Sequence, residues 1–273
     1  MQILTKSKRG CQLKEKKIAI AAAETAGDVI MKYYRSKYEI TDKSPNNPVT
    51  EADLAANYHI QETITSAFPQ DGWLSEESKD SPDRVGKERV WVIDPIDGTL
   101  EFIEGLSQFA VSIALVENNR PIVGVLNNPA TKELFVAVEG EGAHLNGERL
   151  SCLPATKTEQ ATLLASRTEH QRGQLRAFEN RVGKLKYIGS VAYKLGRLAA
   201  GSAHGYLTVQ PKNEWDICAG DLIVREAGGV FWNREGESIQ YNQPDPKQRA
   251  GMFAGRTELV EDLVNLYKEV PNM

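Results

Sequence analysis

The sequence has little cysteine and little histidine, with three Cys and four His in 273 residues. Cys11, Cys152 and Cys218 form neither a CxxC pair nor a disulfide framework, which favours a reducing compartment, and we expect the cytoplasm. The histidines show no i,i+4 pair and have no cysteine nearby, so the ligand spacing of a zinc site is missing.

Long apolar runs and an excess of positive charge are also missing. The apolar stretch Ile18–Ala23 is interrupted by Glu24 and is too short for a signal peptide, and nothing else approaches a membrane span. The 33 Lys+Arg and 37 Asp+Glu give a net charge of −4 with no basic stripe, so we expect neither nucleic-acid nor membrane binding. An anionic substrate must therefore be bound by local groups, for instance metal ions.

Hydrophobic residues make up 41% of the chain, which is enough for a large core. Apolar periodicity predicts helices over 15–38 and 51–68, near 170–181 and 191–201, from about 216 to 227, and at the C-terminal end. Short β-branched runs with tight turns between them predict consecutive antiparallel strands at 90–93, 109–116, 122–126 and 134–138, and further strands that alternate with helices are predicted at 163–166 and 206–209. The pattern indicates a layered α/β or α+β fold with two lobes, 1–150 and 151–273.

Two acidic residues follow directly after one of these strands, in the segment Asp-Pro-Ile-Asp-Gly-Thr at 94–99. Proline fixes φ and glycine adopts conformations that other residues resist, so Asp94 and Asp97 can turn toward one point. The Ile96 carbonyl and the Thr99 hydroxyl lie beside them in the chain. Mg²⁺ is held by such a cluster of oxygens. Asp-Pro and Asp-Gly are also common turn formers, so the segment alone leaves both interpretations open.

Two further acidic segments are ambiguous by themselves. Leu-Ser-Glu-Glu-Ser at 74–78 is a candidate ligand segment or a solvated acidic turn. Asn-Glu-Trp-Asp at 213–216 opens a predicted helix, where Asp216 could simply be the N-cap. Spacing alone does not join the three segments, so the residues by themselves indicate only a candidate divalent-metal site.

The motifs also carry a family resemblance. The segment 94–99, together with Trp215-Asp216 and the later Ala-Gly-Gly at 227–229, resembles the two signature motifs of the inositol monophosphatase superfamily. These proteins are Mg²⁺-dependent, lithium-sensitive phosphomonoesterases. The segments 74–78 and 49–53 fall where the family has its remaining acidic residues, and the similarity covers nearly the whole chain. The resemblance implies an α-β-α-β-α sandwich and often a homodimer.

Metal-binding roles follow from the resemblance, residue by residue. It implies that Glu76, Asp94 and the Ile96 carbonyl bind a first Mg²⁺, and that Asp94, Asp97 and Asp216 bind a second. A third, weaker ion is implied near Glu76. Two cations would stabilise the attacking and leaving oxygens of an in-line displacement.

The resemblance also implies the catalytic pair. Asp53 and Thr99 would orient and deprotonate the attacking water, with Glu76 helping to hold it. No covalent phosphoenzyme is needed. The implied substrate contacts are Asp97, Gly98, Thr99, Gly189, Ser190 and Lys194.

The substrate is a separate question. Inositol monophosphatases have a Glu seven residues before the Asp of the Trp-Asp motif, where it binds inositol hydroxyls, but this sequence has Val209. Valine leaves those hydroxyls unpaired, at a cost of roughly 1–3 kcal/mol each. The run Leu-Glu-Phe-Ile at 100–103 is similar to the Lys-Glu-Phe-Ile of CysQ-type 3′(2′),5′-bisphosphate nucleotidases. Lys194 stands where these relatives have a lysine for a second phosphate, although its spacing from Gly189 is one residue longer than in CysQ. The alternative is that Lys194 is a solvated helix lysine.

The resulting prediction is a Mg²⁺-dependent 3′(2′),5′-bisphosphate nucleotidase that converts adenosine 3′,5′-bisphosphate to AMP and phosphate. The alternative enzyme is an inositol-1-phosphatase or a broader sugar-phosphate phosphatase. A third hypothesis is a regulatory or RNA-associated protein that keeps the fold, and the lack of a basic surface argues against it. Tyr193 could stack on an adenine, although a tyrosine at that helical position more often packs in the core.

Overall fold

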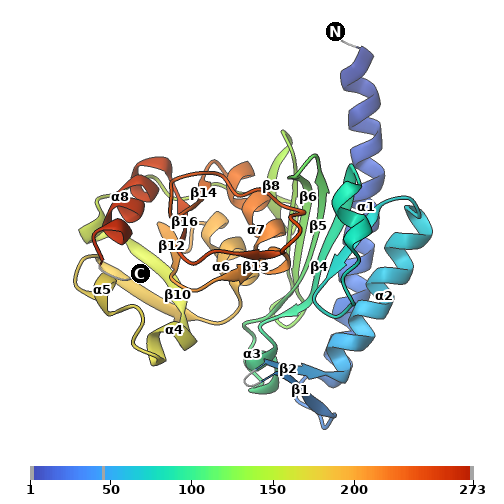
Figure 1. The fold of residues 1–273 in the computed structure, drawn as a ribbon, viewed down its shortest axis with the longest axis horizontal. Coiled ribbons are helices and arrows are strands. Elements are labelled where there is room, and N and C mark those ends of the chain that lie inside the picture. Colours follow the sequence, from blue (N-terminus) through green and yellow to red (C-terminus); the bar gives the residue numbers. More distant parts are fainter. Residues whose placement is uncertain (1–2, 45–46, 271–273) are drawn as a thin grey trace.

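The computed structural model describes residues 3–44 and 47–270. Helices α1 (Ile3–Tyr33) and α2 (Glu51–Ala67) pack against each other and form one outer layer, at the right in Figure 1. The α1 face toward the sheet is built from small residues, among them the fully buried Ala19, Ala22 and Ala26. Helix α2 begins at a capping box, in which Thr50 and Asp53 satisfy each other's backbone N–H groups. In the described part of the chain, no helix is long and apolar enough to cross a membrane.

A seven-stranded sheet forms the second layer. Its order is β3-β4-β5-β6-β7-β8-β9, and all neighbours are antiparallel except β3 and β4, which are parallel. In β4, Val90 and Val92 face one core while Trp91 and Ile93 face the other, which explains a continuous apolar run. The strands are β3 (Gly72–Ser75), β4 (Arg89–Asp97), β5 (Ala110–Glu117), β6 (Arg120–Asn128), β7 (Glu133–Val138), β8 (Gly142–Leu145) and β9 (Glu148–Arg149).

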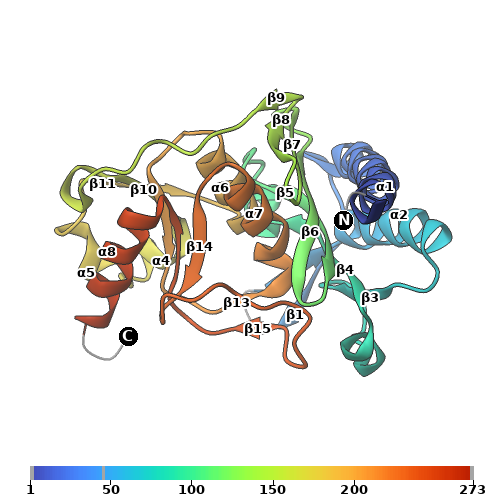
Figure 2. The ribbon, with the colours of Figure 1, turned by 90° about the horizontal axis from the view of Figure 1, so that it is seen from above.

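Helices α6 (Val191–Ala199) and α7 (Glu214–Glu226) form the middle layer between this sheet and a second one, as Figure 2 shows. The second sheet has the order β11-β10-β12-β16-β14 and mixes parallel and antiparallel pairs. Its strands are β10 (Thr162–Ser166), β11 (Lys184–Ile188), β12 (Gly205–Thr208), β14 (Val230–Asn233) and β16 (Met252–Gly255).

Helix α8 (Thr257–Lys268), with the short α4 (Arg167–Gln171) and α5 (Arg176–Glu179), covers the outer face of the second sheet. Three hydrophobic cores fill the spaces between the five layers. The expected α-β-α-β-α sandwich is therefore confirmed. The smaller elements are β1 (Ile40–Ser44), β2 (Asn47–Thr50), η1 (Pro82–Gly86), α3 (Thr99–Ile103), η2 (Thr158–Gln160), β13 (Lys212–Asn213) and β15 (Lys247–Gln248).

Some sequence expectations need correction. The first helix ends at Tyr33 instead of residue 38, because Arg35 adopts a positive φ of 59°. The helix expected at 170–181 is two short helices separated at Gly173, whose φ of 70° is left-handed. No strand is expected from the sequence at 72–75, but β3 forms there and pairs in parallel with β4. Cys152 and Cys218 are buried free thiols, and the Cys11 side chain lies outside the described part.

One glycine sets the distance between the first sheet and α7. A Cβ added to Gly124 of β6 would lie 2.8 Å from the Ala219 carbonyl oxygen of α7. Gly124→Ala is therefore expected to lower the free energy of unfolding by about 1–3 kcal/mol, because backbone must move to make room. Urea unfolding measures the change. Gly86→Ala is the control, because an added Cβ meets nothing within 4 Å; equal stability of both variants would contradict the prediction.

Candidate active site

The strand β4 brings two carboxylates to its end through an irregularity in pairing. Asp94 pairs with Ser112 and Asp97 with Ala110, so three steps along β4 match two along β5. This bulge turns both side chains toward one side. Gly98 then adopts a φ of 97° as the chain enters α3, and a Cβ there would lie 2.8 Å from a backbone oxygen.

Two more acids come from elsewhere in the chain. Glu76 follows β3, and its N–H donates to the Ile93 carbonyl at 3.2 Å, because β3 runs parallel to β4. Asp216 lies in the first turn of α7, and its Oδ2 accepts from the Asn213 N–H at 2.9 Å. The residue preceding the helix is Asn213, so the N-cap interpretation of Asp216 is wrong. Oxygens of Glu76, Asp94 and Asp216 lie within 4.8 Å of one another.

These acids line a pocket of about 310 Å³. Acidic and apolar residues both line it, and among the apolar ones Leu100 is 42% exposed. One lysine, Lys212, also lines it. The lining residues are Pro48, Glu76, Asp94, Ile96, Asp97, Gly98, Thr99, Leu100, Glu101, Val191, Pro211, Lys212, Asn213 and Asp216.

The donor set fits a hard divalent cation. Asp94 Oδ1 accepts from the Ile96 N–H at 3.0 Å, and Asp216 Oδ2 accepts from Asn213. These bonds orient each carboxylate while using one of its two oxygens. Burial raises the pKa of Asp94 and of Asp216 well above the usual range, and the charges of neighbouring acids raise both further. A cation among these oxygens would offset that repulsion, and oxygen ligands of this kind suit Mg²⁺.

Asp97 is held from the opposite side. Its Oδ2 accepts from the Ser190 hydroxyl and from the Ala192 N–H, both at 2.5 Å. Burial raises its pKa, whereas the bond from Ser190 and the charge of Lys194 lower it. Ser190 has a φ of 55° at the start of α6. The start of α6 thus fixes the Asp97 carboxylate by two short bonds.

Thr99 connects the pocket to a buried acid behind it. Its hydroxyl lies 3.1 Å from the Ile96 carbonyl and 3.3 Å from Asp53 Oδ1. Asp53 is 1% exposed, and its other oxygen accepts from both the Thr50 hydroxyl and the Thr50 N–H. A hydroxyl has a single proton to donate. When the Thr99 hydroxyl donates that proton to Asp53, the lone pairs of its oxygen stay available to accept a proton from a water in the pocket.

This arrangement predicts a large effect of removing one hydroxyl. For the hydrolase role that the family resemblance implies, Thr99→Ala should lower kcat about 10²–10⁴-fold at saturating metal, because proton transfer from an attacking water would lose its acceptor. Thr99→Ser keeps the hydroxyl and is the matched control, expected within about tenfold of the wild type. Initial rates of phosphate release measure both. Similar kcat values for the alanine and serine variants would contradict a proton-transfer role.

Lys194 is not a solvated lysine. Its side chain is buried at 2% exposure, and its Nζ donates to the Ile188 carbonyl at 3.1 Å. Burial lowers the pKa of Lys194 to about 8. Among the described residues, Gly189, Ser190 and Lys194 do not line the acidic pocket, and the Gly189 N–H donates to Gln108 Oε1 at 2.7 Å. These residues support the site from behind.

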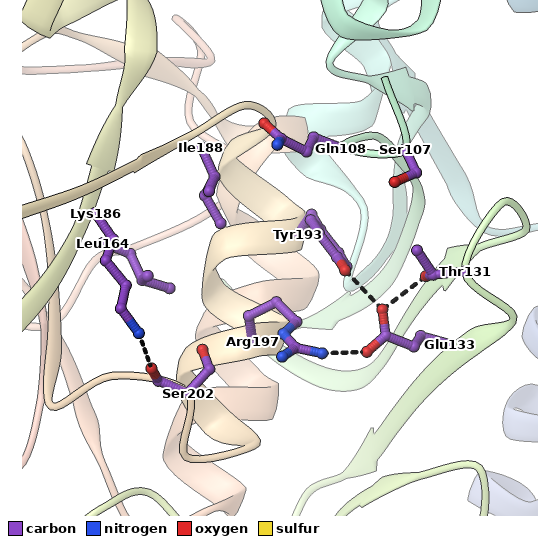
Figure 3. Close-up of a pocket in the computed structure, with 10 residues that line it drawn as sticks. All are labelled: Ser107, Gln108, Thr131, Glu133, Leu164, Lys186, Ile188, Tyr193, Arg197 and Ser202. Atoms are coloured by element: carbon purple, nitrogen blue, oxygen red, sulfur yellow. Dashed lines mark hydrogen bonds and ion pairs between the residues drawn. The ribbon is translucent and has the colours of Figure 1, made fainter. Parts of the chain in front are cut away.

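Tyr193 faces a different cavity, of about 520 Å³ (Figure 3). Its hydroxyl donates to Glu133 at 2.6 Å, and Glu133 also pairs with Arg197 and with the Thr131 hydroxyl. Burial and, to a smaller extent, the bond to Glu133 raise the pKa of Tyr193 to about 12. Tyr193 is 8% exposed and packs in the central core, as expected for a tyrosine at that helical position, and not at the acidic pocket where it could stack on an adenine.

Two residues near the pocket had no signal in the sequence. Glu169 of α4 is 2% exposed; it accepts from the Thr208 hydroxyl and, at 3.1 Å, from the Val209 N–H. Lys212 donates to the same Glu169 at 3.3 Å. A carboxylate therefore lies beside Val209 after all, but these three donors occupy it. Glu169 lies 40 positions before Val209, so only the fold brings them together.

Comparisons with known proteins agree with this geometry. The model of the inositol monophosphatase family matches residues 13–270. A Nus factor SuhB of Pasteurella multocida is 40% identical over 234 residues, covering 80% of this chain and 85% of that protein. An inositol monophosphatase of Dictyostelium discoideum is 33% identical over 267 residues, covering 93% and 94%. The structure of an IMPase of Thermotoga maritima matches with a TM-score of 0.83 at 28% identity, covering 94% and 97%.

Layered fold, acidic pocket and matching relatives together define a phosphatase. The chain belongs to the inositol monophosphatase family.

Proposed function

We propose that this protein is a Mg²⁺-dependent phosphomonoesterase that uses two to three ions and transfers the phosphoryl group directly to water. The observation that carries the proposal is the cluster of Glu76, Asp94 and Asp216 oxygens within 4.8 Å of one another, in residues that line one pocket. When bound, Mg²⁺ supplies positive charge that stabilises the attacking and leaving oxygens and makes water a usable nucleophile near neutral pH.

The chain's own residues have separate tasks in this reaction. Glu76, Asp94, Asp97, Asp216 and the Ile96 carbonyl would hold the ions. The Thr99 hydroxyl would accept the proton of the attacking water while it passes its own proton to the Asp53 carboxylate, to which it donates. Ser190 and the N–H groups at the start of α6 keep the Asp97 carboxylate in place. Orientation by fixed groups of this kind lowers the entropic part of the barrier.

For the substrate we propose a 3′(2′),5′-bisphosphate nucleotide such as adenosine 3′,5′-bisphosphate. Val209 cannot accept a hydrogen bond from an inositol hydroxyl, and Glu169 beside it is occupied by other donors. Apolar groups of Leu100, Val191 and Pro211 at the pocket wall suit a planar base. The run at 100–103 and Lys194 give weaker support to a nucleotidase, because Phe102 is a core residue and Lys194 does not line the pocket.

The second candidate substrate is inositol 1-phosphate. It is favoured by the 33% identity to the Dictyostelium inositol monophosphatase across nearly the whole chain. The 40% identity to a Nus factor SuhB also keeps a role without catalysis as an alternative. The described carboxylate cluster is intact, and this favours catalysis over a purely binding role.

Phosphate release from adenosine 3′,5′-bisphosphate and from inositol 1-phosphate, each with Mg²⁺ and with EDTA, tests the proposal. We expect release only with Mg²⁺, and a kcat/KM at least tenfold higher for the nucleotide, about 1.4 kcal/mol in the transition state. A preference for the inositol ester would overturn the substrate but keep the enzyme class. Folded protein without turnover of either ester would favour the binding role.

A further inference from the structure

A bisphosphate substrate carries a second charge that the metal ions do not meet. Among the described residues that line the acidic pocket, Lys212 carries the one ammonium group. The side chain of Lys212 is 15% exposed, so it is accessible from the pocket while largely desolvated. Its positive charge lowers the pKa of Asp216 against the effect of burial, which places the ammonium group in the electrostatic reach of the metal ligands.

Glu169 holds this lysine in position. Its Oε1 lies 3.3 Å from Lys212 Nζ and also accepts from the Thr208 hydroxyl. Oε2 accepts from the Val209 N–H, so the carboxylate has fixed partners on both oxygens. A lysine ammonium has three donors, and Glu169 takes one of them. The remaining donors can bind an anion, and lysine is a common partner of phosphate.

Two other cations near the pocket, among the side chains that the structure describes, already have partners. Lys194 is 2% exposed and donates to the Ile188 carbonyl. Arg167 pairs with Glu101 at 3.1 Å and with Glu104 at 2.9 Å. Glu101 also lines the pocket, and its pairing with Arg167 reduces the repulsion that an anion would meet there.

We propose that Lys212, positioned by Glu169, binds a second phosphate of the substrate, distinct from the phosphate that is cleaved. The proposal rests on the proposed phosphatase function and assigns its substrate selectivity to a residue outside the two family motifs. Lys212 contacts substrate, whereas Glu169 is a positioning residue that acts through it.

The test compares esters that differ in one phosphate. Wild type, Lys212→Met and Lys212→Arg are assayed with adenosine 3′,5′-bisphosphate and with adenosine 3′-monophosphate. We expect Lys212→Met to lower kcat/KM at least tenfold for the bisphosphate, mainly through KM, and less than twofold for the monophosphate. Lys212→Arg should restore most of the loss. The control is Lys247→Met, an exposed lysine on β15, the strand paired with β13, and it should change neither value.

Equal losses on the bisphosphate and the monophosphate of a pair, or no loss on any ester tested, would overturn the role of Lys212. A second pair of esters, fructose 1,6-bisphosphate and fructose 1-phosphate, tests whether the second phosphate belongs to a nucleotide or to a sugar. If Lys212→Met lowers kcat/KM only for fructose 1,6-bisphosphate, the role of Lys212 stands and the proposed nucleotide substrate is wrong. If the wild type hydrolyses the monophosphate with Mg²⁺ but does not prefer either bisphosphate, the phosphatase function stands and the Lys212 proposal is wrong. If it hydrolyses no ester, the phosphatase proposal itself fails.

The positioning role has its own readout. Glu169→Gln keeps Lys212 charged but weakens its fixed contact. We expect a higher KM for the bisphosphate with kcat within twofold of the wild type, and an unchanged KM for the monophosphate. A fall in kcat on both esters would show that Glu169 is only structural and would overturn its positioning role.

Discussion

Asp94→Asn is expected to abolish Mg²⁺-dependent phosphate release, by about 10³-fold or more, while making the metal-free protein more stable. The two effects have one cause. Asp94 is 1% exposed and surrounded by other acids, so its charge is costly in the empty site and useful only when a cation is bound. Loss of several kcal/mol of charge stabilisation in the transition state gives the rate effect.

Phosphate release and thermal unfolding in EDTA at pH 7.5 measure the two effects of Asp94→Asn. Asp83→Asn is the control, because Asp83 is an exposed acid in η1 that is not among the residues lining the acidic pocket, and it should change neither quantity. Near-normal turnover of Asp94→Asn would exclude Asp94 as a ligand. A metal-free variant less stable than the wild type would show that the carboxylate has a structural role that outweighs its repulsion.

The stability of the metal-free protein is expected to fall as the pH rises from about 4 toward neutrality, relative to Asp94→Asn. Burial, and then the charges of neighbouring acids, raise the folded-state pKa of Asp94 and Asp216 above the unfolded value near 3.8. The folded state therefore keeps protons that the unfolded state releases. This stabilisation is complete below the unfolded pKa and is lost as the pH rises through the folded pKa, by up to about 1.4 kcal/mol per pH unit for each proton.

Urea unfolding at a series of pH values, in EDTA and in excess Mg²⁺, measures this slope. Bound cation favours the ionised carboxylates, so Mg²⁺ should remove most of the difference and raise the stability at pH 7. Asp80 and Glu133 have lowered pKa values, so they make the stability rise with pH. Because they do so equally in the wild type and in Asp94→Asn, the difference between the two proteins isolates the contribution of Asp94. A pH-independent difference between wild type and variant would contradict the predicted linkage.

Most of the fold was predictable because its patterns are local. Apolar periodicity indicated α2, α6, α7 and α8, and the β-branched runs indicated the strands of the first sheet. The exceptions depend on single backbone conformations or on distant pairing. Gly173 divides one expected helix through its positive φ, and β3 pairs in parallel with β4 across a long connection. The division of the chain at residue 150 stays a prediction.

The acidic site was predictable for a different reason. The ligand candidates lie in short motifs, so Asp94, Asp97 and Asp216 could be named from the sequence, and the structure brings Asp94 and Asp216 together with Glu76. Substrate contacts depend on which side chains reach the pocket wall. Lys194 was named from its position in a motif but is buried behind the pocket, whereas Lys212 was found only when its strand was placed beside α7.

The close contact between Gly124 and Ala219 has a consequence for ion choice. Ala219 is one helical turn after Asp216 on α7, while Asp94 and Asp97 belong to the sheet on which α7 rests. The depth of α7 against that sheet therefore sets the size of the oxygen cage. Mg²⁺ requires a small, rigid cage, whereas Ca²⁺ accepts longer and more variable distances. The missing side chain at residue 124 thus helps to set, at a distance from the carboxylates, how closely Asp216 approaches Asp94, and the proposed Mg²⁺ enzyme requires that spacing to suit the smaller ion.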